Sequence, residues 1–135
     1  MCGGKIVIVS EHQTVAGVWL SADSALPFTP ENIALLGGGL LDALSRSQSG
    51  VTHPKDWKAI FVSVLRASGA KSFKAFMQAA KHVGVEAADE TLVLRPSRNL
   101  GVKDGLEPKS EVAIESNAEA HAAGAALLAA LTDAE

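Results

Sequence analysis

The sequence is poor in cysteine and in aromatic residues, and each shortage excludes a class of protein. Cys2 is its one cysteine, so a disulfide framework or a cysteine metal site cannot form within the chain, and a reducing, cytoplasmic setting fits. Aromatic residues make up 4% of the chain and tyrosine is absent. Because few side chains remain for stacking on bases, we expect no direct nucleic-acid partner.

Long hydrophobic runs are also missing. No stretch approaches the roughly 20 apolar residues that a membrane-spanning helix needs, and the short apolar run in MCGGKIVIVS does not resemble a secretory signal. We therefore expect a cytoplasmic protein that is neither exported nor held in a membrane.

What is present is typical of a globular protein. The chain has 135 residues, of which 47% are hydrophobic and 20% are charged. A chain of this length is about one domain and buries roughly two thirds of the surface that it exposes when unfolded. The sequence therefore predicts a single domain over residues 1–135.

The charges are divided unevenly between the two halves of the chain. The formal net charge is −3, but residues 1–83 carry an excess of positive charge and residues 84–135 an excess of negative charge. An acidic half steers a basic partner during encounter, whereas the simpler interpretation is an ordinary solvated face. Acids of this half that we single out as partner-binding candidates are Glu86, Asp89, Glu90, Asp104, Glu107 and Glu111.

Residues 1–50 predict strands followed by a helix. The β-branched run at residues 5–10 indicates a strand, buried on both faces if it is central, and we expect residues 14–20 to pair with it. Thr29 as N-cap and Pro30 as first helical residue predict a helix over residues 30–46. Three successive glycines at 37–39 either break this helix or let another element pack closely on it.

Residues 51–82 predict a pair of helices. Asp56 caps the first, whose apolar residues follow helical spacing from residue 57 to residue 65, although a strand over residues 59–65 is the alternative. Gly69 ends this helix, and Ser72 caps a second one. The inward face of the second helix consists of Phe73, Phe76, Met77 and Ala80.

The last part of the chain predicts two strands and a helix. The strands cover residues 91–95, closed by Pro96, and residues 112–116, with a polar loop between them. Ser116 or Asn117 caps the final helix, whose apolar stripe is Ala123, Ala126, Leu127, Ala130 and Leu131. Strands and helices that do not alternate regularly indicate an α+β fold, here a mostly antiparallel sheet with about four helices.

No motif in the sequence carries recognisable chemistry, so we predict no catalytic, cofactor or metal site and no enzyme. The four histidines lack metal-ligand spacing, and the glycines at 37–39 and the GAKS run at 69–72 lack the frame of a phosphate loop. Two of the acids Glu86, Asp89 and Glu90 could act as a general acid and a general base if an apolar pocket surrounded them. The simpler interpretation is that all three are ionised and in contact with solvent. We expect Trp19 and Trp57 in the core rather than in an interface.

Several segments of the second half nevertheless resemble a known family. KSFKAF at 71–76, RPSRNLG at 95–101, Gly105 and GAALLAAL at 124–131, with Trp57 as an upstream match, are similar to immunity proteins of bacterial contact-dependent growth inhibition systems. The resemblance covers about the last half of the chain and has no counterpart in the first 50 residues. It implies a small cytoplasmic α+β protein that neutralises the toxic C-terminal domain, often a nuclease, of a large surface effector. No catalytic residues are carried over.

The resemblance implies a cognate toxin domain as partner, and the six acids named above are our candidates for its contact surface, because the site of an RNA-cleaving partner is basic. Two other hypotheses remain open. One is a small enzyme with an unrecognised site. The other is a homo-oligomeric subunit whose final helix packs on its own copy through Gly124 and the surrounding alanines.

Overall fold

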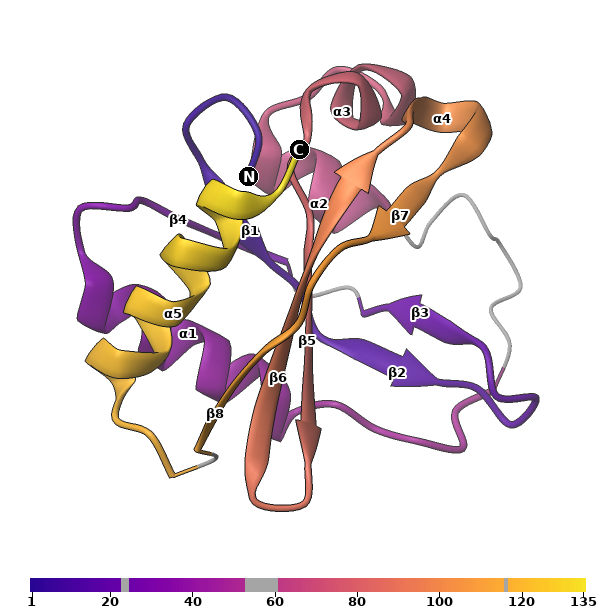
Figure 1. Cartoon of the computed structure of the whole chain (residues 1–135). Helices are drawn as coiled ribbons and strands as arrows, with labels where there is room; N and C mark the ends of the chain where they lie inside the picture. Colours follow the sequence, from indigo (N-terminus) through magenta and orange to yellow (C-terminus); the bar gives the residue numbers. More distant parts are fainter. Residues whose placement is uncertain (23–24, 53–60, 116) are drawn as a thin grey trace.

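The computed structural model describes residues 1–22, 25–52, 61–115 and 117–135. These residues form five helices and eight strands (Figure 1). Every pair of named strands is antiparallel, and the arrangement is α+β, as the sequence predicts. The strands are β1 (Ile6–Ile8), β2 (Glu11–Gln13), β3 (Trp19–Ser21), β4 (Leu26–Phe28), β5 (Val83–Ala88), β6 (Thr91–Asn99), β7 (Leu106–Pro108) and β8 (Val112–Glu115). The helices are α1 (Ile33–Ser45), α2 (Val62–Ser68), α3 (Phe73–Ala79), α4 (Gly101–Asp104) and α5 (Ala120–Asp133).

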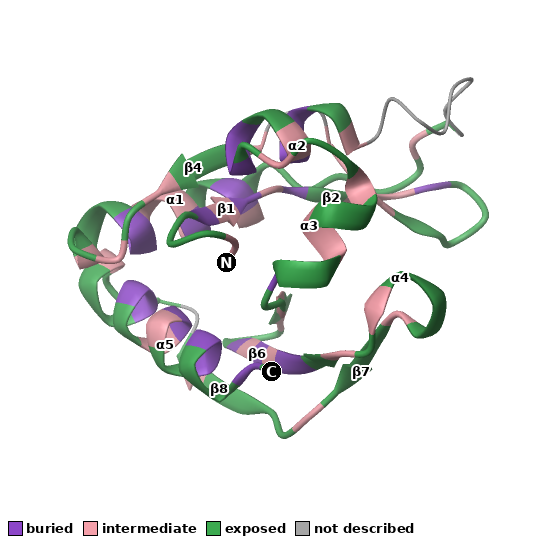
Figure 2. Cartoon of the chain, turned by 90° about the horizontal axis from the view of Figure 1, so that it is seen from above, coloured by how far each residue is buried: buried purple, intermediate pink, exposed green. Residues whose placement is uncertain are grey.

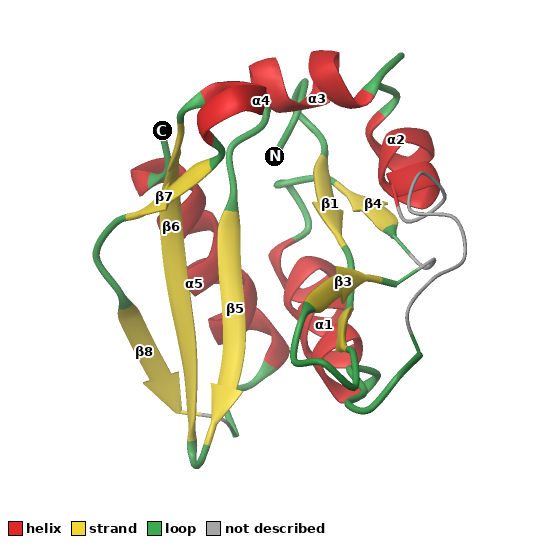
Figure 3. Ribbon diagram, turned by 90° about the vertical axis from the view of Figure 1, so that its right-hand side faces the viewer, coloured by secondary structure: helices red, strands yellow, loops and turns green. Residues whose placement is uncertain are grey.

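The largest sheet is built around β6. This strand pairs with β5 along one edge, and with β8 and then β7 along the other. Its residues Leu92, Leu94 and Pro96 are buried, and α5 covers the face of the sheet from which they point (Figure 3). Because side chains alternate along a strand, Val93 and Arg95 of β6 point from the opposite face. Glu86 of β5 is opposite Val93 and lies on that same face.

The core joins this sheet to the N-terminal half through two helices that pack on each other. Leu36 and Leu40 of α1, Leu127 and Leu131 of α5, and Leu94 of β6 all belong to one buried cluster. Ile6 and Ile8 of β1 extend the cluster to the far side of α1. The predicted apolar stripe of the final helix is confirmed, since four of its five members are buried and Ala126 packs against them.

The three glycines of α1 do not break the helix, which runs without interruption from Ile33 to Ser45. A Cβ atom on Gly37 would overlap the carbonyl oxygen of Ala120, and a Cβ atom on Gly39 would overlap the ring of Phe28. The close-packing interpretation is therefore the correct one, because α5 and β4 approach the backbone of α1 at these positions.

The N-terminal strands pair differently from the prediction. β1 pairs with β4, not with residues 14–20, and lies in a two-stranded sheet with one buried face. β2 instead pairs with β3 across a tight turn in which the Gly17 amide donates to the Thr14 carbonyl over 2.9 Å. Gly17 has a φ of +86°, which glycine adopts readily, so this local hairpin forms in place of a pairing with β1.

Two predicted helix caps are wrong. Asn32, not Thr29, caps α1, because its side chain accepts a hydrogen bond from the Leu35 amide over 3.1 Å. The final helix begins after Glu119, beyond Asn117, because the chain first turns where the Ala118 amide donates to the Glu115 carbonyl. The other proposed cap, Ser116, lies outside the described residues.

The helical pair in the middle of the chain is confirmed where it is described. α2 is a helix rather than a strand and ends at Gly69, whose φ is +74°. Ser72 caps α3 by accepting from the Ala75 amide over 3.1 Å, and the rings of Phe61 and Phe73 pack with centroids 4.5 Å apart. The proposed cap Asp56 and the predicted first turn lie outside the described residues.

The region between residues 83 and 111 is more structured than predicted. β5 was not expected, and β6 continues through Pro96 to Asn99 because the following amide, that of Ser97, donates to the His82 carbonyl over 3.0 Å. The expected polar loop contains α4 and β7.

Candidate functional site

The six predicted partner-binding acids are all exposed on or beside the large sheet, and we call them the acidic surface. Glu86 is on β5, Asp89 and Glu90 form the turn between β5 and β6, Asp104 is on α4, Glu107 is on β7 and Glu111 precedes β8. The turn and α4 lie at opposite ends of β6, whose nine residues extend about 30 Å. The acids are therefore spread along the sheet and do not form one cluster.

Arg95 and Arg98 of β6 form ion pairs with three of the six carboxylates of the acidic surface. Arg95 donates to Glu86 over 2.7 Å and to Glu111 over 3.2 Å. The hydrogen bond that Arg95 donates to Glu86, and secondly the one to Glu111, raise the pKa of the Arg95 guanidinium.

A second cluster is built in the same way around Arg98. Its guanidinium donates to Glu135 over 2.8 Å and to Glu107 over 3.3 Å. The hydrogen bond from Arg98 is the main cause of a lowered pKa of the Glu135 carboxyl. Three of the six acids thus have an arginine partner within the sheet, which reduces the charge that they present to a partner.

Asp89, Glu90 and Asp104 are not in ion pairs with other residues of the described ranges. Asp89 takes a left-handed conformation with φ of +53°, which aspartate tolerates better than most residues. These three acids are the part of the acidic surface whose charge is available at long range.

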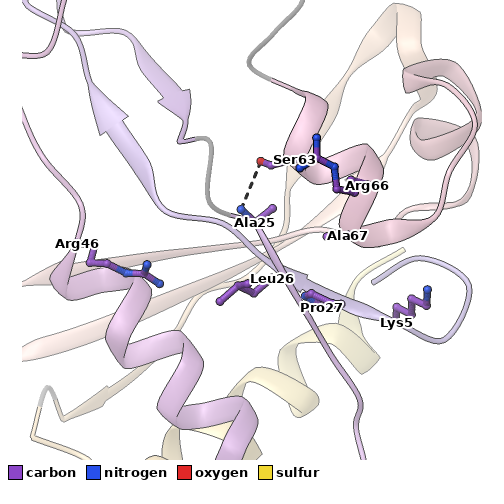
Figure 4. A pocket seen from close by; sticks show the side chains of 8 residues that line it. All are labelled: Lys5, Ala25, Leu26, Pro27, Arg46, Ser63, Arg66 and Ala67. Atoms are coloured by element: carbon purple, nitrogen blue, oxygen red, sulfur yellow. Dashed lines mark hydrogen bonds between the residues drawn. The ribbon is translucent and has the colours of Figure 1, made fainter.

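A cavity of opposite character lies in the N-terminal half, between α1, β4 and α2. Its volume is about 460 Å³, and we call it the basic cleft because three cationic side chains line it (Figure 4). The lining residues are Lys5, Ala25, Leu26, Pro27, Arg46, Ser63, Arg66 and Ala67. In Figure 4, Leu26 and Pro27 of β4 lie between Arg46 on one side and Lys5 on the other.

Local structure places each cation at the edge of the basic cleft. Arg46 is the C-cap of α1 and forms an exposed ion pair with Asp42, one turn earlier, over 2.8 Å. Arg66 is in the last turn of α2, and Lys5 Nζ lies near Gly69 at the end of the same helix. Ser63 accepts from the Ala25 amide over 3.3 Å and so ties α2 to the start of β4.

The basic cleft and the acidic surface lie on opposite sides of the molecule. In Figures 2 and 3, α2 and β4 are on one side, and the sheet of β6 and β8 is on the other, with α1 and α5 between. The division of charge along the sequence therefore becomes a division in space.

Sequence reasoning missed Lys5, Arg46 and Arg66 as a group. The positive charge of residues 1–83 was the one signal of such a site. These three cations are far apart in the chain and meet only because β1, α1 and α2 pack around β4.

Trp19 was expected in the core, and that prediction is wrong. Its side chain is 52% exposed on β3, beside the exposed Val15 and Val18 of the same hairpin. In Figure 1 the β2–β3 hairpin extends to the side, away from α5 and from the contact between the core helices. The other tryptophan, Trp57, lies outside the described residues.

Three alternatives from the sequence can be compared with the geometry. Among the described residues, no three His, Cys, Asp or Glu side chains gather as metal ligands. Glu86, a candidate acid–base residue, is instead paired with Arg95. Gly124, the proposed contact of a homo-oligomer, packs against Ile33 and Gly37 of its own chain, so it is not on the surface.

No helix within the described parts of the chain has the length and apolar character to cross a membrane.

Comparison with known proteins gives likeness in structure alone. No protein-family model matches the chain, and no curated protein matches its sequence. A solved protein of unknown function from Neisseria meningitidis has a TM-score of 0.81 and 16% identity, covering 100% of this chain and 92% of that one. A chain of the CdiA-CT/CdiI toxin and immunity complex from Yersinia pseudotuberculosis has a TM-score of 0.80 and 14% identity, covering 100% and 94%. At these identities the likeness shows a common fold.

Proposed function

We propose that this protein is a cytoplasmic immunity protein that binds and neutralises the C-terminal toxin domain of a contact-dependent growth inhibition effector. The observation that carries the proposal is the fold shared, over the full length of this chain, with a chain of a toxin and immunity complex. The sequence resemblance, which rests on different grounds, leads to the same function.

The residues that carry the resemblance occupy positions that determine the fold. Ser72 caps α3, Gly105 follows α4 with φ of +75°, and Gly124 lies at the contact between α5 and α1. Segments of this kind identify an architecture and not a contact surface, because these residues cap a helix, allow a turn or pack between helices. This supports the family proposal and leaves the choice of binding surface to other observations.

Inhibition by binding requires no catalytic group in this chain, and we propose that it is not an enzyme. A specific partner covers about 800 Å² of each protein, which is about a tenth of the 7909 Å² surface of this chain. The acidic surface is the contact site that we predict from the sequence, because its negative charge complements a toxin whose nucleic-acid-binding site is basic.

Co-expression tests the function directly. Cells that express the toxin domain encoded in the neighbouring gene should stop growing, and this protein should restore growth and co-purify with the toxin domain. As a matched control, a Leu36→Asp variant that disrupts the buried core should give no protection. Arrest of growth in the presence of abundant, folded protein would contradict the proposal.

A further inference from the structure

The basic cleft is a distinctive electrostatic feature of the N-terminal half. Lys5, Arg46 and Arg66 come from three separate elements and line one cavity of about 460 Å³. None of the lining residues that the structure describes is acidic. A concave surface with charge of one sign focuses the field and concentrates counter-charges within it.

The chemistry of the lining indicates the kind of group that fits. Arginine presents a planar set of N–H donors that matches the two oxygens of a carboxylate or a phosphate. The cleft also holds apolar surface, since Leu26 is 49% exposed between the cations and Pro27 lies beside it. A small inorganic anion would leave this surface in water, whereas an acidic side chain on a protein segment would cover it.

We propose that the basic cleft binds a carboxylate-bearing segment of the toxin domain, with Arg46 and Arg66 as its main anion contacts. The inference rests on the proposed function and names the surface that performs it. β4 has three residues, of which Pro27 lacks an amide donor, so it is a poor template for added strand pairing and we expect side chains to provide the contacts here.

The cleft and the acidic surface make competing predictions. Because they lie on opposite sides of the molecule, a compact partner that covers about a tenth of the surface contacts one or the other. Existing ion pairs weaken the acidic surface more than the cleft. Arg95 and Arg98 bind three of the six acids, Glu86, Glu107 and Glu111, whereas in the cleft Asp42 binds Arg46, and Lys5 and Arg66 form no ion pair with other residues of the described ranges.

The test compares two double charge reversals in the full chain. Arg46→Glu/Arg66→Glu reverses the cleft, and Lys74→Glu/Lys103→Glu makes the same change in charge at exposed positions of α3 and α4. Binding to the purified toxin domain is measured by calorimetry, and circular dichroism establishes that each variant is folded. We expect Kd to rise at least about tenfold for the cleft variant and to change less than about twofold for the control.

A milder variant separates lost contacts from a damaged fold. Arg46→Gln/Arg66→Gln removes the two charges without adding carboxylates near Asp42, and we expect an intermediate loss of affinity. If the wild-type protein binds the toxin domain and both cleft variants bind it equally well, the inference is wrong while the proposed function stands. If the wild-type protein forms no complex, the proposed function itself fails, and this inference fails with it.

A nucleic acid is the other anionic partner that such a cleft suits. A fluorescent single-stranded oligonucleotide provides the probe, and we expect the wild-type protein not to bind it at physiological salt. Oligonucleotide binding that is lost in the Arg46→Glu/Arg66→Glu variant, with toxin binding unchanged, would overturn the inference.

Discussion

Gly37 of α1 and Gly124 of α5 lie against each other where the two helices pack. A Cβ atom on Gly37 would lie 2.6 Å from the amide nitrogen of Gly124, and one on Gly124 would lie 3.1 Å from the amide nitrogen of Gly37. The two backbones are therefore in contact, and no side chain fits between them. This contact joins the N-terminal half, which carries the basic cleft, to the sheet that carries the acidic surface.

Gly37→Ala should destabilise the protein because its methyl group meets the rigid backbone of α5 at Ala120. We expect a loss of about 3 kcal/mol in the free energy of unfolding, the upper end of the range for overpacking, measured by urea denaturation. Gly38→Ala is the matched control, since a Cβ atom there has nothing within 4 Å. It should stabilise the helix by up to about 1 kcal/mol. Equal effects of the two substitutions would contradict the described packing.

The cap of α1 gives a second test. Asn32→Ala removes the acceptor of the Leu35 amide and should cost about 1 kcal/mol in the free energy of unfolding. Thr29→Ala, at the cap that the sequence predicts, should cost almost nothing, because Thr29 is exposed and lies outside the helix. A larger loss of stability for Thr29→Ala than for Asn32→Ala would contradict Asn32 as the cap and indicate that the helix begins earlier.

Stability should fall as the pH is lowered through the region below 6.5. Partial burial, and secondly the ammonium group of Met1, lower the pKa of His82 from its ordinary value of 6.5. The unfolded chain then binds a proton more readily than the folded one, so acid favours unfolding in the interval between the two pKa values. His82→Asn should flatten this part of the profile in thermal denaturation from pH 7 to pH 5. A steeper dependence in the variant would contradict the assignment.

The acidic surface makes a kinetic prediction. Asp89→Asn/Glu90→Gln/Asp104→Asn removes the charges without an ion-pair partner in the described ranges and leaves the Arg95 and Arg98 clusters intact. If the acids steer the toxin domain, the association rate at low salt should fall by about tenfold, and the difference should vanish near 1 M salt. An unchanged rate at low salt would remove the acidic surface from consideration and favour the basic cleft.

The sequence predicts local features of this fold well. The helix end at Gly69, the cap at Ser72 and the apolar stripe of α5 depend on residues a few positions apart, and all three are present. The α+β class is also confirmed. These features follow from preferences that neighbouring residues express without the rest of the fold.

Long-range pairing was not predictable from local patterns. β1 pairs with β4 across about 20 residues, and β5 forms from an alanine- and glycine-containing stretch because β6 lies beside it. The basic cleft has the same origin, since its lysine and arginines become neighbours only through packing. The sequence alone therefore indicated the net charge of each half of the chain. It did not indicate that Lys5, Arg46 and Arg66 line one cavity.

Calorimetric titration of the purified toxin domain with this protein tests the proposed function most directly. We expect saturation at one chain for each toxin domain, with loss of the toxin's activity at the same ratio. The absence of binding heat at several temperatures, together with full toxin activity in the presence of a tenfold excess of folded protein, would contradict it.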